Sequence, residues 1–107
     1  MNLNLTGRHL EITPAMRQHV ADKIAKLKSH FDGVMDVAVV LSVDKLRQKA
    51  EGSVHLSGKD VFVDAEDDNM YVAIDNMVEK LDRQILKHKE KYAARRHDDS
   101  GKHSAAE

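Results

Sequence analysis

The segment from Asp67 to Arg96 constrains the fold most, because its apolar side chains have the periodicity of one long amphipathic helix. They recur three and four residues apart and fall on one arc of a helix with about 3.6 residues per turn. An arc of this length has to be buried, so the segment predicts a helix packed against a second layer. The arc consists of Met70, Ile74, Met77, Val78, Leu81, Ile85 and Tyr92.

The charged side chains of this predicted helix are sorted by side. Basic residues follow one flank of the apolar arc and acidic residues follow the other, whereas a helix stabilised by surface ion pairs mixes the two signs along one face. A basic stripe beside an apolar face is typical of a surface that follows phosphates. The basic flank is Lys80, Arg83, Lys87 and Lys91, and the acidic flank is Asp75, Glu79 and Asp82.

Length and composition indicate one small soluble domain, because the 107 residues are 41% hydrophobic and 33% charged. No apolar run approaches the roughly 20 residues that span a bilayer. The N-terminus also lacks the pattern of a secretory signal, so we expect a cytoplasmic protein. The absence of cysteine excludes disulfides, thiol catalysis and thiolate zinc sites.

The formal net charge of -1 would ordinarily argue against nucleic acid, but the charge is unevenly distributed. From Lys80 to Arg96 there are seven Lys or Arg residues against two acids, and from Asp60 to Asp68 there are five acids and no base. Since local charge decides what a surface binds, the C-terminal helix is expected to face an anionic partner.

The remaining elements follow from alternation and end signals. Thr13 and Pro14 predict the start of a first helix, with Thr as N-cap and Pro in the first turn. This helix is expected to end near Phe31, before Asp32-Gly33, and Asp67 or Asp68 is expected to cap the long helix. Polar–apolar alternation predicts strands at Asn2–Thr6, Val34–Asp44, Lys49–Leu56 and Asp60–Glu66.

The predicted order β-α-β-β-β-α defines an α+β two-layer sandwich, with a four-stranded mixed sheet and both helices on one face. The first two strands should be parallel with a right-handed crossover, and the last three should form an antiparallel meander. We expect the helices to run side by side with the basic groups on their outer flanks. Residues 1–96 form this domain, and residues 97–107, which have little apolar content, are expected to be a disordered tail.

Three blocks of the sequence resemble the bacterial ribosome hibernation factors, formerly named sigma-54 modulation proteins. They are GRHLEITPAMRQHVADKIAKL, the following HFD, and DNMYVAIDNMVEKLDRQILKHKEK, and the similarity extends over about residues 1–92. The resemblance implies a fold similar to double-stranded-RNA-binding domains. It also implies a protein that lies on 16S ribosomal RNA in the decoding channel of the small ribosomal subunit, at the A and P sites. There it would block messenger and transfer RNA and inhibit translation in stationary phase.

Two branches of this family remain open. EITPAMRQHVADKIAKL is similar to protein Y, which blocks translation but opposes the pairing of ribosomes. DKLRQKAE, HLSGKDV and KHKEK are similar to the short hibernation promoting factor, which pairs ribosomes together with a small ribosome modulation factor. We favour the short factor, because the tail lacks the long acidic, Phe-containing end of protein Y. A monomer is expected off the ribosome.

The RNA-facing positions implied by the resemblance are basic residues of the two helices, and they agree with the stripe predicted from helix geometry. Their role would be to neutralise phosphates, which gives salt-dependent affinity based mainly on shape. The positions are Lys23, Lys26, Lys80, Arg83, Lys87 and Lys91, with Arg8 and Lys28 as additions.

The same sequence features allow other interpretations. A basic helix flank is most often only solvated surface, but the sorted charges and the family resemblance favour RNA. A domain that grips an acidic protein partner is a further hypothesis. An enzyme is not expected, because there is no Gly-rich phosphate loop and no nucleophile beside a base. No cofactor and no metal are expected, since the acids at Asp64, Glu66, Asp67 and Asp68 lack calcium-loop spacing.

Overall fold

The computed structural model describes the backbone of residues 2–30, 36–56 and 58–96, and the side chains of residues 3–27, 36–56 and 58–88. The expected end of the first helix at Phe31 and Asp32-Gly33, the side chain of Tyr92 and the tail at 97–107 lie outside these ranges. The elements are β1 (Asn2–Arg8), α1 (Pro14–His30), β2 (Asp36–Asp44), β3 (Arg47–Leu56), β4 (Lys59–Asp67) and α2 (Met70–Arg96).

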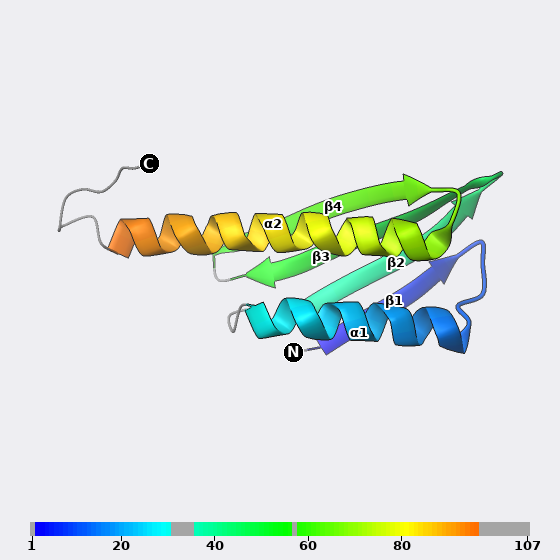
Figure 1. Cartoon of the computed structure of the whole chain (residues 1–107), viewed down its shortest axis with the longest axis horizontal. Helices are drawn as coiled ribbons and strands as arrows, with labels where there is room; N and C mark the ends of the chain where they lie inside the picture. The colour runs from blue at the N-terminus through cyan, green and yellow to red at the C-terminus, as the bar shows by residue number, and fades with distance from the viewer. Residues whose placement is uncertain (1, 31–35, 57, 97–107) are drawn as a thin grey trace.

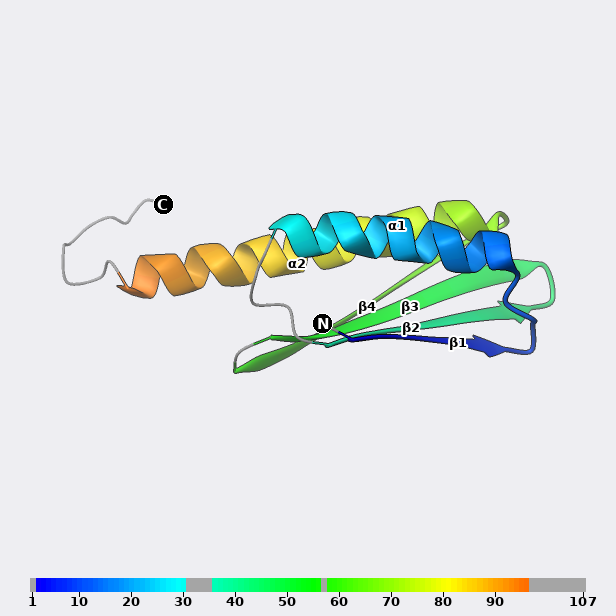
Figure 2. The same cartoon turned by 90° about the horizontal axis from the view of Figure 1, so that it is seen from below.

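The four strands form one mixed sheet in the order β1-β2-β3-β4, coloured from blue to green in Figure 1. β1 pairs with β2 in parallel, and the β2–β3 and β3–β4 pairs are antiparallel. Both helices lie on the same face of this sheet and leave the other face open (Figure 2). The predicted α+β two-layer sandwich is therefore confirmed.

The core lies between the sheet and the two helices. Strand alternation puts Val37, Val39 and Leu41 of β2 on the helix side, where each is fully buried. The buried arc of α2 also matches the prediction in its described part. Among the residues whose side chains are described, no polar or charged one is buried. The other buried hydrophobic residues are Val20, Ile24, Leu27, Ala50, Val54, Leu56, Val61, Ala65, Met70, Ala73, Ile74, Met77, Val78, Leu81 and Ile85.

The predicted cap of α1 is confirmed. The Met16 amide donates to Thr13 Oγ1 at 3.1 Å, and Pro14 is the first residue of the helix. This arrangement satisfies a helix N–H group that has no partner within the helix.

The predicted cap of α2 is wrong, because Asn69 occupies that position. The Tyr71 amide donates to Asn69 Oδ1 at 2.8 Å, and the Ala73 amide donates to the Asn69 carbonyl at 3.0 Å. The Asp68 side chain makes a tertiary contact instead, because it accepts a hydrogen bond from Arg47 at 3.0 Å. Asp67 supports the cap by accepting from the Asn69 amide at 2.9 Å.

Strand β3 begins two residues earlier than predicted, at Arg47 rather than Lys49. Only Lys45 and Leu46 lie between β2 and β3, and Lys45 adopts a φ of 58°. A positive φ matches a two-residue hairpin turn to the twist of its strands, which allows pairing to continue up to the turn. At the next hairpin, Gly58 has a φ of 76°.

Candidate nucleic-acid interface

The basic stripe of α2 includes Lys80, which lies on the flank of the helix next to β4. Lys80, Arg83 and Lys87 are all exposed, and the Arg83 side chain keeps 71% of its surface accessible. Lys80 reaches towards the sheet, where its ammonium donates to the Asp64 carbonyl of β4 at 2.7 Å. Lys80, Arg83 and Lys87 follow one flank of α2 as predicted, but Arg83 also pairs with Glu79 at i,i+4, so the two signs are not fully separated on the described part of this helix.

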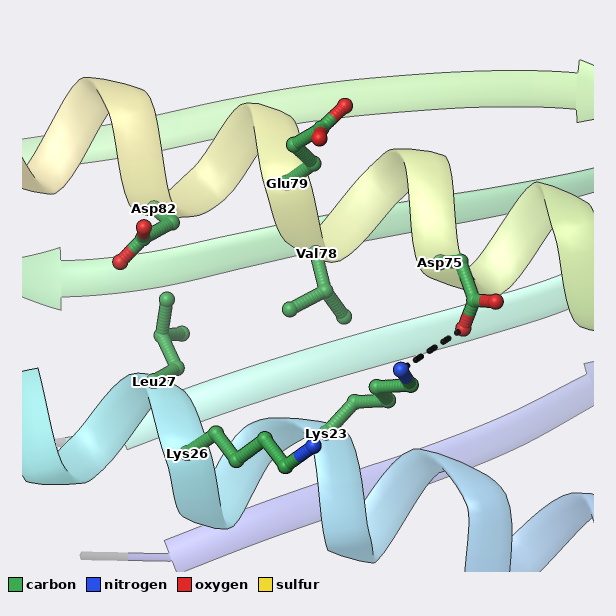
Figure 3. Close-up of a pocket in the computed structure, with 7 residues that line it drawn as sticks. All are labelled: Lys23, Lys26, Leu27, Asp75, Val78, Glu79 and Asp82. Atoms are coloured by element: carbon green, nitrogen blue, oxygen red, sulfur yellow. Dashed lines mark ion pairs between the residues drawn. The ribbon is translucent and has the colours of Figure 1, made fainter.

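Lys23 and Lys26 do not lie on the outer flank of α1, contrary to the prediction. They line a groove between the two helices, with a volume of about 260 Å³ and a floor that includes Leu27 and Val78 (Figure 3). The cause is the rotation of α1 about its axis, because burial of Val20 and Ile24 turns this flank towards α2. The opposite wall of the groove carries the three acids of α2, Asp75, Glu79 and Asp82.

Asp75 is the centre of the contacts between the helices. Its Oδ1 accepts a hydrogen bond from His19 Nε2 at 2.7 Å and lies 3.6 Å from Lys23 Nζ. The Tyr71 ring packs edge-on against His19, with ring centroids 5.1 Å apart. Tyr71 therefore lies at the rim of this contact on the surface. The periodicity of each helix gave no signal for this pairing, because it depends on how the two helices face each other.

Glu79 lies on the outward side of the groove. Its Oε1 is 3.5 Å from Arg83 Nη2, one helical turn further along α2. Two of the cations predicted to bind phosphate, Lys23 and Arg83, are thus each in contact with a carboxylate of α2.

Arg8 is on the opposite side of the molecule from the helix cations. In the sheet register it stands beside Ser42, which stands beside Lys49, and this row belongs to the open face of the sheet. A shallow cavity of about 350 Å³ there is lined by Arg8 and Lys49 together with Glu51 and Glu66. The structure therefore does not bring Arg8 together with the cations of α1 and α2.

Lys28 and Lys91 belong to α1 and α2 by their backbone, but their side chains lie outside the described residues. Their proposed role as RNA contacts stays a prediction from the sequence.

The acidic cluster near the end of β4 is part of a surface ion-pair network. Arg47 contacts Glu66 at 3.6 Å and Asp68 at 3.0 Å, and Lys49 lies 4.0 Å from Asp64. Across the described part of the chain, no group of three or more His, Cys, Asp or Glu residues is arranged to hold a metal ion. Within the described ranges, neither helix contains an apolar stretch that could span a bilayer.

Comparison with known proteins identifies a family with this fold. Residues 3–93 match the family described as sigma 54 modulation protein / S30EA ribosomal protein. The chain belongs to this family. Since the match covers most of the chain, it confirms the family inferred from the sequence.

Curated members of the sigma 54 modulation / S30EA family are similar over nearly their whole length. A ribosome hibernation promoting factor from Azotobacter vinelandii is 46% identical over 95 residues, which is 89% of each chain. A protein with the same name from Escherichia coli K12 is 44% identical over 91 residues, covering 85% of this chain and 96% of that one.

Two solved structures share the fold. The N-terminal domain of Thermus thermophilus Protein Y has a TM-score of 0.77 and 42% identity, over 82% of this chain and 99% of that one. A ribosomal subunit interface protein from Coxiella burnetii has a TM-score of 0.79 and 28% identity, over 83% and 98% of the two chains.

Proposed function

We propose that this protein is a ribosome hibernation factor that binds the small ribosomal subunit. It lies on 16S ribosomal RNA in the decoding channel, at the A and P sites, where it excludes messenger and transfer RNA and inhibits translation in stationary phase. The observation that carries this proposal is the exposed basic stripe of α2 in a protein whose relatives are named for ribosome hibernation. Such a factor acts in the cytoplasm and is a monomer off the ribosome.

In the proposed mechanism the protein inhibits by occupying the binding site of messenger and transfer RNA, and it catalyses no reaction. Arg83 and Lys87 extend from a rigid helix and neutralise phosphates of the RNA backbone, which releases counterions. Phosphate contacts position a protein on RNA without reading its bases, so recognition depends on the shape of the RNA. The helix layer binds the RNA, and the bulk of the domain then fills the space that messenger and transfer RNA need.

Charge reversal of the stripe tests this proposal. We expect Arg83→Glu with Lys87→Glu to abolish co-sedimentation with small subunits, because two attractive phosphate contacts become repulsive. Both side chains are exposed, so the fold should persist, which circular dichroism can verify.

The matched control is Lys45→Glu with Lys59→Glu, which makes the same change in net charge at exposed positions in the hairpins. This control should co-sediment like the wild type. Unchanged co-sedimentation of the Arg83/Lys87 variant, or equal loss by the control, would refute the stripe as the binding surface.

We further propose that the protein acts as the short hibernation promoting factor and pairs ribosomes together with a ribosome modulation factor. The names of the curated relatives support this branch. The 42% identity to a Protein Y domain favours the alternative, in which the protein blocks translation but opposes pairing. Sucrose gradients run with and without the protein, with modulation factor present, separate the two. Protein in a paired-ribosome peak supports the first, and protein on single ribosomes with pairing suppressed supports the second.

A domain that binds an acidic protein is the remaining candidate, since the same basic stripe fits such a partner. Ribonuclease treatment of a lysate discriminates between the two. Heavy co-sedimentation should disappear if the partner is the ribosome and should persist if the partner is a protein.

A further inference from the structure

The acids Asp75, Glu79 and Asp82, here called the carboxylate row, lie between two sets of cations in the helix layer. Lys23 and Lys26 of α1 face the row across the groove (Figure 3). On α2 itself, Arg83 and Lys87 follow the other side of the row, as spacing of about 100° per residue requires. Any RNA that lies on both sets of cations therefore passes over the carboxylate row.

The carboxylate row already occupies part of the basic surface. Asp75 lies 3.6 Å from Lys23 Nζ, and Glu79 lies 3.5 Å from the Arg83 guanidinium. The Asp75 and Glu79 side chains keep 44% and 66% of their surface accessible, so RNA can reach both pairs. A phosphate that binds Lys23 or Arg83 has to compete with a carboxylate fixed within the same molecule.

The competition does not affect every RNA equally. At about 0.1 M salt, charges closer than about 10 Å still interact strongly, so carboxylates beneath an RNA repel its phosphates. A flexible strand that follows cations from one helix to the other crosses the carboxylate row. A folded RNA can hold its phosphates over the cations and keep them away from the acids.

We infer that Asp75, Glu79 and Asp82 are specificity-determining residues, which weaken binding to arbitrary RNA more than binding to the small ribosomal subunit. This inference rests on the proposed function. Specificity is a difference between two affinities, and it rises when groups that repel the wrong partner are built into the surface.

The test neutralises the carboxylate row in the full chain with Asp75→Asn, Glu79→Gln and Asp82→Asn. Fluorescence anisotropy with a labelled short uridine oligonucleotide should show binding about tenfold tighter than that of the wild type. With Lys23 and Arg83 both released, the slope of log affinity against log salt should steepen by about 1.4, since each single-strand phosphate contact adds about 0.7. Affinity for purified small subunits should change less than about threefold. An unchanged oligonucleotide affinity, or an equal gain for both ligands, would overturn the inference.

The control neutralises three acids on the open face of the sheet, with Asp36→Asn, Asp44→Asn and Glu51→Gln. This control raises the net charge by the same amount at positions that alternate with the buried residues of β2 and β3. This variant should bind the oligonucleotide within about twofold of the wild type, because it acts through screened distances. A gain equal to that of the carboxylate-row variant would make net charge the cause and overturn the inference.

Asp75 also bonds His19, so its replacement could disturb the contact between the helices. A second variant avoids this effect. Glu79→Gln alone leaves Asp75 intact and should bind the oligonucleotide about threefold more tightly; no gain in this folded variant would equally overturn the inference.

Failure of the inference and failure of the proposed function can be distinguished. If the wild type does not co-sediment with small subunits, the proposed function falls, and with it the specificity that this inference assigns. If the wild type co-sediments and neutralisation brings no gain for the oligonucleotide, the function stands and only the inference falls.

Discussion

At the scale of single residues, Gly52 lies where α2 packs directly on β3. A Cβ atom added at this position would come within 2.5 Å of Met77 Sδ and 3.0 Å of Leu81 Cδ1. Met77 is fully buried, so it has little space into which to move. Glycine here is explained by the close approach of the helix, since extended backbone by itself accepts any residue.

We expect Gly52→Val to lower the free energy of unfolding by about 1–3 kcal/mol, because overpacking forces side chains out of their preferred rotamers. Urea unfolding measures the change. Ser53→Val is the control, because Ser53 is the next residue of β3 and points to the open face of the sheet. The loss of unfolding free energy caused by Gly52→Val should be smaller in a Met77→Ala background, since Met77→Ala makes room for the new methyl groups. If the losses of unfolding free energy caused by the two substitutions were strictly additive, Met77 would not be the side chain that clashes with the valine.

At the scale of elements, the start of α2 depends on Asn69. We expect Asn69→Ala to cost about 1 kcal/mol in the free energy of unfolding, because the Tyr71 amide loses its side-chain acceptor. Asn76→Ala is the matched change at an exposed position inside the same helix, and it should be neutral or stabilising by helix propensity. Thermal or urea unfolding of both variants measures these changes. An equal change in the free energy of unfolding for the two variants would exclude Asn69 as the cap.

The elements and the buried arcs could be predicted from sequence because period and end signals are local. The N-cap residue of α2 could not be predicted, since the side chains of Asp67, Asp68 and Asn69 can all accept from a helix amide. Which of them caps the helix depends on the contact between Asp68 and Arg47. The same distinction holds for the candidate site. Exposure of Arg83 followed from the periodicity of α2, whereas the position of Lys23 in the groove depends on how α1 is rotated against the sheet. Such rotation is a property of packing between elements, which no single segment encodes.

At the scale of the whole molecule, α2 is longer than the layer beneath it. Its last turns, drawn orange in Figure 1, continue past the sheet and past the end of α1. A helical segment without a packed layer depends on its own propensity and on the helix that it continues, so it opens more easily than the turns over the sheet. This segment also contains Lys91, one of the predicted RNA contacts.

Amide hydrogen exchange should therefore differ along α2. In the free protein we expect residues 90–96 to exchange at least about a hundredfold faster than residues 73–85, because local opening of a packed helix approaches the cost of global unfolding. Binding to small subunits should slow the exchange of residues 90–96, since RNA then supplies the contacts that the sheet does not. The Arg83→Glu, Lys87→Glu variant should show no such slowing when mixed with subunits. Uniform exchange along α2 in the free protein would mean that its last turns are as stable as the packed ones, and that the end of the helix is already ordered before it meets RNA.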